Sequence, residues 1–288
     1  MDTRFWGPSG WKLLHLISFD YTFSPENAIT YARFLETIPY MLPCKFCRAS
    51  LTDYYRQHPY YIGGFTINGR NDMNPTLDMK RWMYTIHNCV NSKLKKQGLH
   101  KTRNPSFSVV SAMYTDLLKC PWNQQLALCW DFLFAVAYHH PKEKNLYAKP
   151  MPDCPKEVYT CKDACEKNKW NLLPLKERME WFKRFWSYLP AVLPSEMAQK
   201  WKSMEEKHPP TLSSRKSALA WLWRMRCGLD SGFADPYTSV CKKIAKYSSD
   251  CGKSNRSVTC RRLLRNKTLR NKTLRNKTLR KTKKKQNK

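Results

Sequence analysis

The hydrophobic residues of this chain recur at helical spacing and almost nowhere alternate as they would in a strand. Between Ser9 and Asp20, for example, Trp11, Leu14 and Ile17 fall on one helical face. The same reasoning predicts a helix that begins at the Ser24-Pro25-Glu26 cap and ends near Pro39, and further helices over about 44–55, 76–98 and 105–119. Only 9 glycines among 288 residues argue against a Gly-rich nucleotide-binding α/β fold. The sequence therefore predicts an all-α fold, a helix bundle.

A predicted loop interrupts this helical pattern. Residues 60–75 are rich in Gly, Asn and Pro, which favours a connection without regular structure. Thr76 follows directly and is suited to cap the next helix, whose apolar stripe includes Met79, Met83 and Ile86.

Positive charge is concentrated at the C-terminal end. The chain has 52 Lys and Arg against 22 Asp and Glu, a formal net charge of +30. Residues 253–288 contain 16 of the basic residues and no acidic one, and Arg-Asn-Lys-Thr-Leu recurs there in tandem. Because few apolar residues accompany this charge, we expect a disordered arm. Such an arm is typical of an electrostatic contact with nucleic acid or another polyanion, and a tolerated repeat expansion would look the same.

The chain carries no obvious signal for membranes or export. The most apolar stretch, residues 126–138, is shorter than the roughly 20 residues of a membrane span and contains Asp131. The N-terminal residues lack the basic-then-apolar layout of a signal peptide. The sequence therefore predicts a soluble protein that is not secreted. In a reduced compartment its 12 cysteines are expected to be metal ligands or redox groups more often than structural disulfides.

Cys44-Lys45-Phe46-Cys47 is the one Cys-x-x-Cys motif of the sequence, and it begins a predicted helix. A helix N-terminus favours thiolate over thiol, and Lys45 and Arg48 add positive charge nearby. This setting favours a dithiol/disulfide redox pair. The alternative is half of a structural zinc site, which needs a second ligand pair. The other candidates for that pair fit its spacing poorly: Cys161-x-x-x-Cys165, Cys154 and His139-His140.

Two predicted helices each present a histidine on an apolar face. His15 lies four residues after Trp11 on the first helix, and His87 lies four residues before Asn91 on the fourth. Buried polar groups need hydrogen-bond partners, so each could be a satisfied core residue. Together with Trp82 and Asn88 they would also line the site of a flat, heteroatom-rich cofactor.

These elements, in this order, resemble the Erv/ALR family of flavin-dependent sulfhydryl oxidases. The resemblance extends from about Trp6 to Leu118. It rests on the ordered motifs Trp11-x-x-Leu14-His15, Pro43-Cys44-x-x-Cys47, and Trp82 five residues ahead of His87-Asn88-x-Val90-Asn91-x-x-Leu94.

The resemblance implies a small helical bundle that binds FAD, commonly as a homodimer. It implies that electrons pass from protein dithiol substrates through Cys44 and Cys47 to FAD and then to O2, giving hydrogen peroxide. Cys44 would receive the substrate thiolate, and Cys47 would lie nearest the flavin. The residues expected to contact FAD are Trp11, His15, Trp82, His87, Asn88 and Asn91, with Lys93 and Lys96 near the phosphates and Tyr114 as the aromatic of the last bundle helix.

The chain departs from the family pattern in two places. Tyr84 and Ser108 stand where many members carry a structural disulfide, so that bridge is expected to be missing. Leu42 stands where an aromatic residue often precedes the first redox cysteine, and Tyr40 could substitute for it.

The second half of the chain weakly echoes the first. Similar segments follow in the same order: Trp130-x-x-Leu133 with Trp11-x-x-Leu14, residues 191–198 with 40–47, and His208-Pro209 with His58-Pro59. Ser195 and Ala198 replace the redox cysteines, and the His-Asn motif is absent. The hypothesis is a degenerate copy with an insertion at about 141–171, acting as a built-in dimer partner or substrate platform. An unrelated helical domain with chance matches is the alternative.

We therefore divide the chain into an oxidase domain at 1–119, a second helical domain at 120–252 and a basic tail at 253–288. The first functional hypothesis is a viral thiol oxidase. A chain that combines the family motifs with no export signal resembles the sulfhydryl oxidases of large cytoplasmic DNA viruses. It would act in the host cytoplasm or virus factory, and could enter the virion. The second is a non-catalytic, basic nucleic-acid-binding protein with a structural Cys or zinc site.

Cys154, Cys161 and Cys165 could form a shuttle disulfide or a structural pair, while Cys89, Cys120 and Cys129 are expected to be small buried residues.

Overall fold

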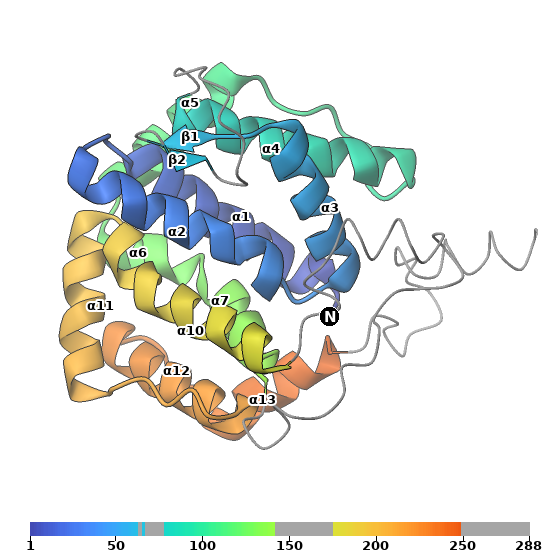
Figure 1. Ribbon diagram of the computed structural model, residues 1–288. Coiled ribbons are helices and arrows are strands. Elements are labelled where there is room, and N and C mark those ends of the chain that lie inside the picture. Colours follow the sequence, from blue (N-terminus) through green and yellow to red (C-terminus); the bar gives the residue numbers. More distant parts are fainter. Residues whose placement is uncertain (63–64, 67–77, 142–174, 249–288) are drawn as a thin grey trace, which may run out of the picture.

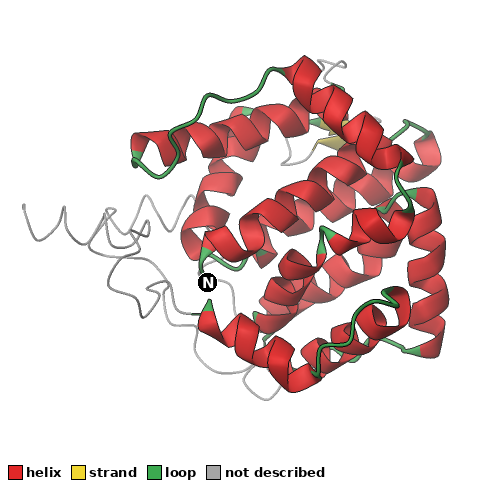
Figure 2. Ribbon diagram, turned by 180° about the vertical axis from the view of Figure 1, so that it is seen from behind, coloured by secondary structure: helices red, strands yellow, loops and turns green. Residues whose placement is uncertain are grey.

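The computed structural model describes residues 1–62, 65–66, 78–141 and 175–248 (Figure 1). Its first half contains α1 (Thr3–Asp20), α2 (Pro25–Met41), α3 (Lys45–Gln57), α4 (Met79–Lys96) and α5 (Phe107–Lys119). Its second half contains α6 (Trp122–Ala127), α7 (Trp130–Tyr138), α10 (Leu175–Val192), α11 (Ser195–Lys207), α12 (Arg215–Leu229) and α13 (Tyr237–Lys246). Figure 2 shows the same helical layout from behind, and among the described residues strand occurs only in one small hairpin. The predicted all-α class is confirmed.

The ends of the helices refine the sequence-based boundaries. The Ser24 cap of α2 is confirmed, because its hydroxyl accepts the Asn27 N–H at 3.2 Å while the Asn27 side chain accepts the Ser24 N–H. α1 begins at Thr3, six residues earlier than expected, since Asp2 caps it by accepting the Arg4 N–H. α4 begins at Met79 behind an Asp78 cap, and the predicted cap Thr76 lies outside the described residues.

The predicted loop at 60–75 contains a short hairpin. β1 (Tyr61–Ile62) pairs antiparallel with β2 (Phe65–Thr66), with Tyr61 opposite Thr66. A two-residue strand is too short to show the alternation by which sequence reveals strands, so pattern analysis could not find it.

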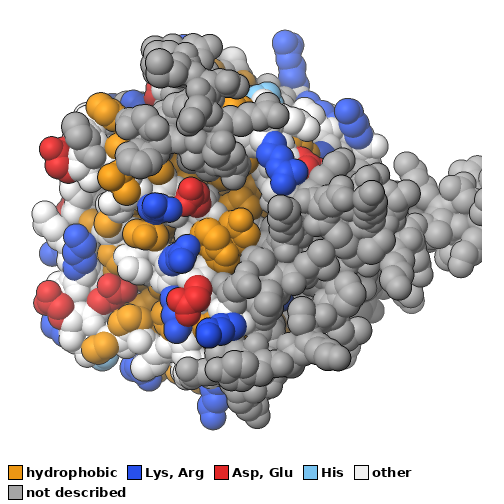
Figure 3. Space-filling model, viewed as in Figure 1, with side chains coloured by type: hydrophobic (Ala, Val, Ile, Leu, Met, Phe, Trp, Pro, Cys, Tyr) orange, Lys and Arg blue, Asp and Glu red, His pale blue; other side chains and the backbone are white. Residues whose placement is uncertain are grey.

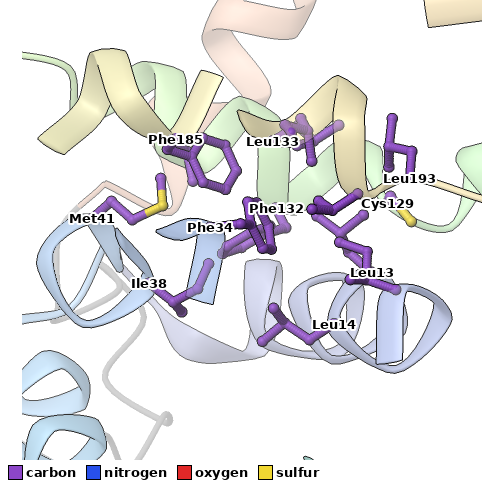
Figure 4. Packing of buried hydrophobic residues seen from close by; sticks show 14 of the residues in the cluster. Leu13, Leu14, Phe34, Ile38, Met41, Cys129, Phe132, Leu133, Phe185 and Leu193 are labelled. Carbon is purple, nitrogen blue, oxygen red and sulfur yellow. The ribbon is translucent and has the colours of Figure 1, made fainter. Parts of the chain in front are cut away.

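One hydrophobic core runs through both halves. α1 packs against α7, and α2 packs against α10, so that the two halves meet along these four helices (Figure 1). The side chains at this junction include Phe34 from α2, Phe132 from α7 and Phe185 from α10, all fully buried (Figure 4). On the outer face of α2 and α10, hydrophobic side chains are interspersed with charged ones (Figure 3).

Not every expectation about the cysteines holds. Cys129 is fully buried, as predicted, but Cys89 and Cys120 are only half-buried. Cys154, Cys161 and Cys165 lie outside the described residues, as does the basic tail. Within the described part of the chain, no helix has the length and apolar character needed to span a bilayer.

Candidate functional site

The Cys-x-x-Cys motif lies at the start of α3. Cys44 is the N-cap residue, and its sulfur accepts the backbone N–H of Cys47 at 3.3 Å. Both cysteines are half-buried thiols packed against the hydrophobic core. The helix start therefore presents the two thiols one turn apart, as the sequence predicts.

The surroundings of Cys44 favour its thiolate. The pKa of the Cys44 thiol is lowered, first by the hydrogen bond from the Cys47 side chain and further by the Cys47 backbone N–H and the Arg48 charge, which together outweigh burial. Arg48 is held in place because its guanidinium donates to the carbonyl of Leu42 at 2.8 Å. An attacking or leaving sulfur at this position is thus stabilised as an anion.

A cluster of flat rings lies between α1, α4 and α5. The imidazole of His87 stacks on the indole of Trp11, with ring centroids 3.9 Å apart and an interplanar angle of 10°. The imidazole of His15 stacks on the ring of Tyr114 at 4.7 Å. A hydrogen bond of 2.9 Å joins His15 Nε2 to His87 Nδ1. The structure therefore brings together four of the predicted cofactor residues, including Tyr114, from three helices.

Both histidines in this cluster are neutral near pH 7. Burial is the main cause that lowers the pKa of His15 to about 3, and electrostatic repulsion from Lys12 and from a protonated His87 adds to it. Burial also lowers the pKa of His87 to about 4. One imidazole consequently donates its N–H to the lone pair of the other. His15 Nδ1 is buried, and no partner for it is found among the described residues.

The remaining predicted contacts follow along α4. Asn88 and Asn91 are half-buried, so their amides are available at the surface of the bundle. Lys93 contacts the hydroxyl of Ser50 on α3, and Lys96 is exposed. The basic end of α4 thus lies beside the helix that carries the cysteines.

Trp82, also predicted to contact the cofactor, lies in the hydrophobic core. Its side chain is fully buried, its Nε1 donates to the carbonyl of His58 at 2.7 Å, and its ring packs against Tyr55 and Tyr60. This indole joins α4 to the end of α3, which favours a packing role for it.

These residues fit a flavin by their chemistry. Flat rings, two uncharged imidazoles, an unpaired buried imidazole nitrogen and two neighbouring amides match the flat, heteroatom-rich ring system that a flavin presents. Lysines farther along the same helix suit phosphate. Among the described residues, no group of three or more His, Cys, Asp or Glu suited to a metal ion occurs.

Tyr84 and Tyr40, which belong to the two departures from the family pattern, make other contacts in the structure. Tyr84 ties α4 to the start of α5, because its hydroxyl donates to the carbonyl of Pro105 at 2.8 Å and its ring meets Phe107 edge-on. Tyr40 stacks on Trp181 of α10 at 4.0 Å, so it serves the junction between the halves. Sequence reasoning missed both contacts, because neither partner is marked by a local motif.

Known proteins resemble the first half of the chain. Residues 8–109 match the model of the Erv1/Alr family. A probable FAD-linked sulfhydryl oxidase of Acanthamoeba polyphaga mimivirus is 28% identical over 101 residues, which cover 34% of this chain and 65% of that protein. A putative FAD-linked sulfhydryl oxidase of Invertebrate iridescent virus 3 is 27% identical over 105 residues, covering 34% and 62%.

The FAD-linked sulfhydryl oxidase of African swine fever virus is 28% identical over 94 residues, 32% of this chain and 70% of that protein. The chain thus spans somewhat under two thirds of the length of the mimivirus and iridescent virus relatives. No solved structure matches it.

Proposed function

Since residues 8–109 match the model of the Erv1/Alr family, we propose that the chain is an FAD-dependent thiol oxidase that forms disulfides in proteins. The observation that carries the proposal is the conjunction of two features in that segment. One is the Cys44–Cys47 pair at a helix start that favours thiolate. The other is the cluster of neutral imidazoles and flat rings on α1, α4 and α5.

The sulfur chemistry follows the rules of thiol–disulfide exchange. A substrate thiolate attacks Cys44 Sγ of the oxidised pair, a mixed disulfide forms, and Cys47 leaves as a thiolate. A second substrate thiolate then attacks the substrate sulfur of the mixed disulfide and releases Cys44. The substrate has lost two electrons and two protons, and Cys44 and Cys47 have gained them. The stabilised Cys44 thiolate makes that residue the better leaving group in the second step.

The residues proposed to hold FAD are those of the ring cluster and of α4. Trp11, His15, His87 and Tyr114 offer ring faces, while Asn88 and Asn91 offer amides, and Trp82 keeps α4 in register with α3. Lys93 and Lys96 supply positive charge for the phosphates. The chemistry that FAD supplies when bound is two-electron transfer from a dithiol to O2, with hydrogen peroxide as the product.

The relatives suggest where such an enzyme would act. Those named above are viral proteins. We propose that this chain likewise forms disulfides in viral proteins, in the host cytoplasm or virus factory. The basic tail, residues 253–288, is proposed to hold the protein near a polyanion such as nucleic acid.

A visible absorption spectrum and oxygen consumption with dithiothreitol test the proposed activity. We expect the purified protein to show flavin bands and to consume oxygen. Cys47→Ser should keep the flavin bands and lose oxygen consumption. Cys227→Ser is the matched control, because Cys227 is exposed on α12, outside the site. A colourless protein that takes up no added FAD, or a fully active Cys47→Ser, would refute the proposal.

A further inference from the structure

We propose that α7 and α10–α13 are a second copy of the α1–α5 bundle, which covers the α1–α2 face in place of another chain and has lost the cofactor site. The pairs are α1 with α7, α2 with α10, α3 with α11, α4 with α12 and α5 with α13. The part of this inference that concerns the cofactor rests on the proposed function, and the part that concerns the covered face does not.

The helices pack in the same way within each half. α1 packs against α4 and α5, and its counterpart α7 packs against α12 and α13. α3 lies between α2 and α4, as α11 lies between α10 and α12. Two unrelated helical units would share this whole set of neighbours only by coincidence.

A pair of buried tryptophans makes the same bond in both halves. Trp82 Nε1 donates to the carbonyl of His58 at 2.7 Å, and Trp221 Nε1 donates to the carbonyl of His208 at 2.9 Å. Each histidine is the C-cap of its helix, with backbone angles of φ −128°, ψ 71° and φ −133°, ψ 78°. Pairwise agreement of donor, acceptor and backbone conformation points to one ancestral arrangement.

A second pair of contacts agrees as well. Two residues after each tryptophan, Tyr84 donates to the carbonyl of Pro105 at 2.8 Å, and Trp223 donates to the carbonyl of Asp235 at 3.0 Å. Each of these rings also meets the first residue of the next helix nearly edge-on. The interplanar angles are 72° for the pair with Phe107 and 71° for the pair with Tyr237.

The junction between the halves has the form of a dimer interface. Phe34 and Phe185 are counterparts, each eight residues before the leucine that directly follows its proline-containing helix, and their ring centroids lie 5.5 Å apart. Equivalent residues meet one another only on a two-fold axis. The ring of Phe132 on α7 lies against Gly10 on α1.

The second copy keeps the tryptophan of the site and replaces the imidazoles. Trp130 corresponds to Trp11, while Phe134 and Arg226 stand where the first half has His15 and His87. The Arg226 guanidinium lies 5.5 Å from the centroid of the Trp130 ring and 3.9 Å from that of Phe233.

Arg226 is fixed there by an ion pair with Asp230, which stands in place of Asn91. A charged side chain thus occupies the position of a neutral, stacked imidazole. Ser195 and Ala198 stand in place of Cys44 and Cys47, so this half has no thiol pair at the start of its α11. We therefore expect one flavin per chain. A homodimer, expected from the family resemblance, could not use the covered α1–α2 face.

Engineered cysteines at the two-fold axis test the covered face in the full-length protein. In Phe34→Cys/Phe185→Cys, oxidation with diamide should link the two positions within one chain, as read by peptide mass spectrometry. Phe34→Cys and Phe185→Cys alone are the matched controls and should give no covalent dimer. Tyr40→Cys/Trp181→Cys, at the half-buried edge of the same junction, serves as the second pair if the first variant does not fold.

Covalent dimers through position 34 alone, or interchain links in both double variants, would overturn the proposal that the second half covers this face.

The flavin content of the wild-type protein, measured by absorbance against total amino acids, tests the lost site. A ratio of one per chain is expected, and a ratio of two would overturn the degenerate site. A ratio of zero would instead refute the proposed oxidase, while the cross-linking result would still decide the arrangement of the halves.

Discussion

At the scale of single residues, the hydrogen bond between His15 and His87 joins two helices inside the ring cluster. This bond replaces the hydrogen bonds to water that two ring nitrogens lose when they are buried, and both imidazoles remain uncharged. The pair therefore stabilises the bundle and also keeps the ring cluster neutral.

Replacing His87 by Phe separates these two roles. The ring can still stack on Trp11, but His15 Nε2 loses its partner in a buried position. We expect the free energy of unfolding, from urea denaturation, to fall by about 1–3 kcal/mol. His100→Phe is the control, since His100 lies near the surface and should change stability by less than about 0.5 kcal/mol. Equal stability of His87→Phe and wild type would show that the bond contributes nothing.

Sequence spacing predicted which residues gather here but not how they touch. Helical periodicity placed His15 and His87 on inward faces, and the family resemblance added Tyr114. The direct bond between the imidazoles depends on the register of α1 against α4, which no local pattern encodes. The carbonyl of Pro105, which bonds Tyr84, is likewise invisible to motif reasoning because any residue has a carbonyl.

At the scale of elements, the contact between α1 and α7 depends on one missing side chain. A Cβ atom at Gly10 would lie 2.9 Å from Cδ2 of Phe132, whose ring is fully buried. Gly7, one turn earlier on the same helix, has no heavy atom within 4 Å of such a Cβ. The two glycines therefore differ in packing, and Gly7 also directly precedes Pro8 in the helix.

This difference gives a matched pair of substitutions. Gly7→Ala should change the free energy of unfolding by less than about 1 kcal/mol, because alanine favours the helix but the following Pro8 disfavours a Cβ at a helical position before it. Gly10→Ala gains the same helical preference but must displace the Phe132 ring, so we expect a net loss of about 1–3 kcal/mol. Thermal and urea unfolding of both variants would check this. If both glycines responded alike, α1 and α7 would not be packed as closely as described.

Elements were predicted best where capping chemistry and periodicity agreed. The Ser24 box and the start of α3 at Cys44 follow directly from residue type. The start of α4 was misplaced because both Thr76 and Asp78 can cap a helix, and a short-range pattern does not choose between them.

At the scale of the whole molecule, the repeated order of motifs predicted two related halves, but it did not predict which helices of the two halves pack together. The echoes around Trp130 and His208 suggested a repeat, yet the stretches between them have diverged. A comparison of the two sequence segments cannot show that Phe34 contacts Phe185. That contact lies at the two-fold axis between the halves and depends on how the folded halves pack together.

Four histidines distributed over the molecule make its stability depend on pH. Burial is the main cause that lowers the pKa of His15 and His139 to about 3 and that of His87 and His140 to about 4. The unfolded chain binds protons at these residues below about pH 6.5, while the folded protein does not until about pH 4. The stability that they contribute is therefore present above pH 6.5 and lost as the pH falls.

We accordingly expect the melting temperature to fall steadily between pH 6.5 and pH 5, a window above the titration of ordinary carboxylates. His139→Asn/His140→Asn should flatten this dependence, because it removes two of the four groups, directly after the end of α7, while leaving the ring cluster intact. Calorimetry of wild type and the double variant across the window would measure both slopes. A wild-type melting temperature that stays constant from pH 6.5 to 5 would mean that these imidazoles are solvated in the folded protein, and the packing of α1 and α4 around His15 and His87 would have to be looser than the structure has it.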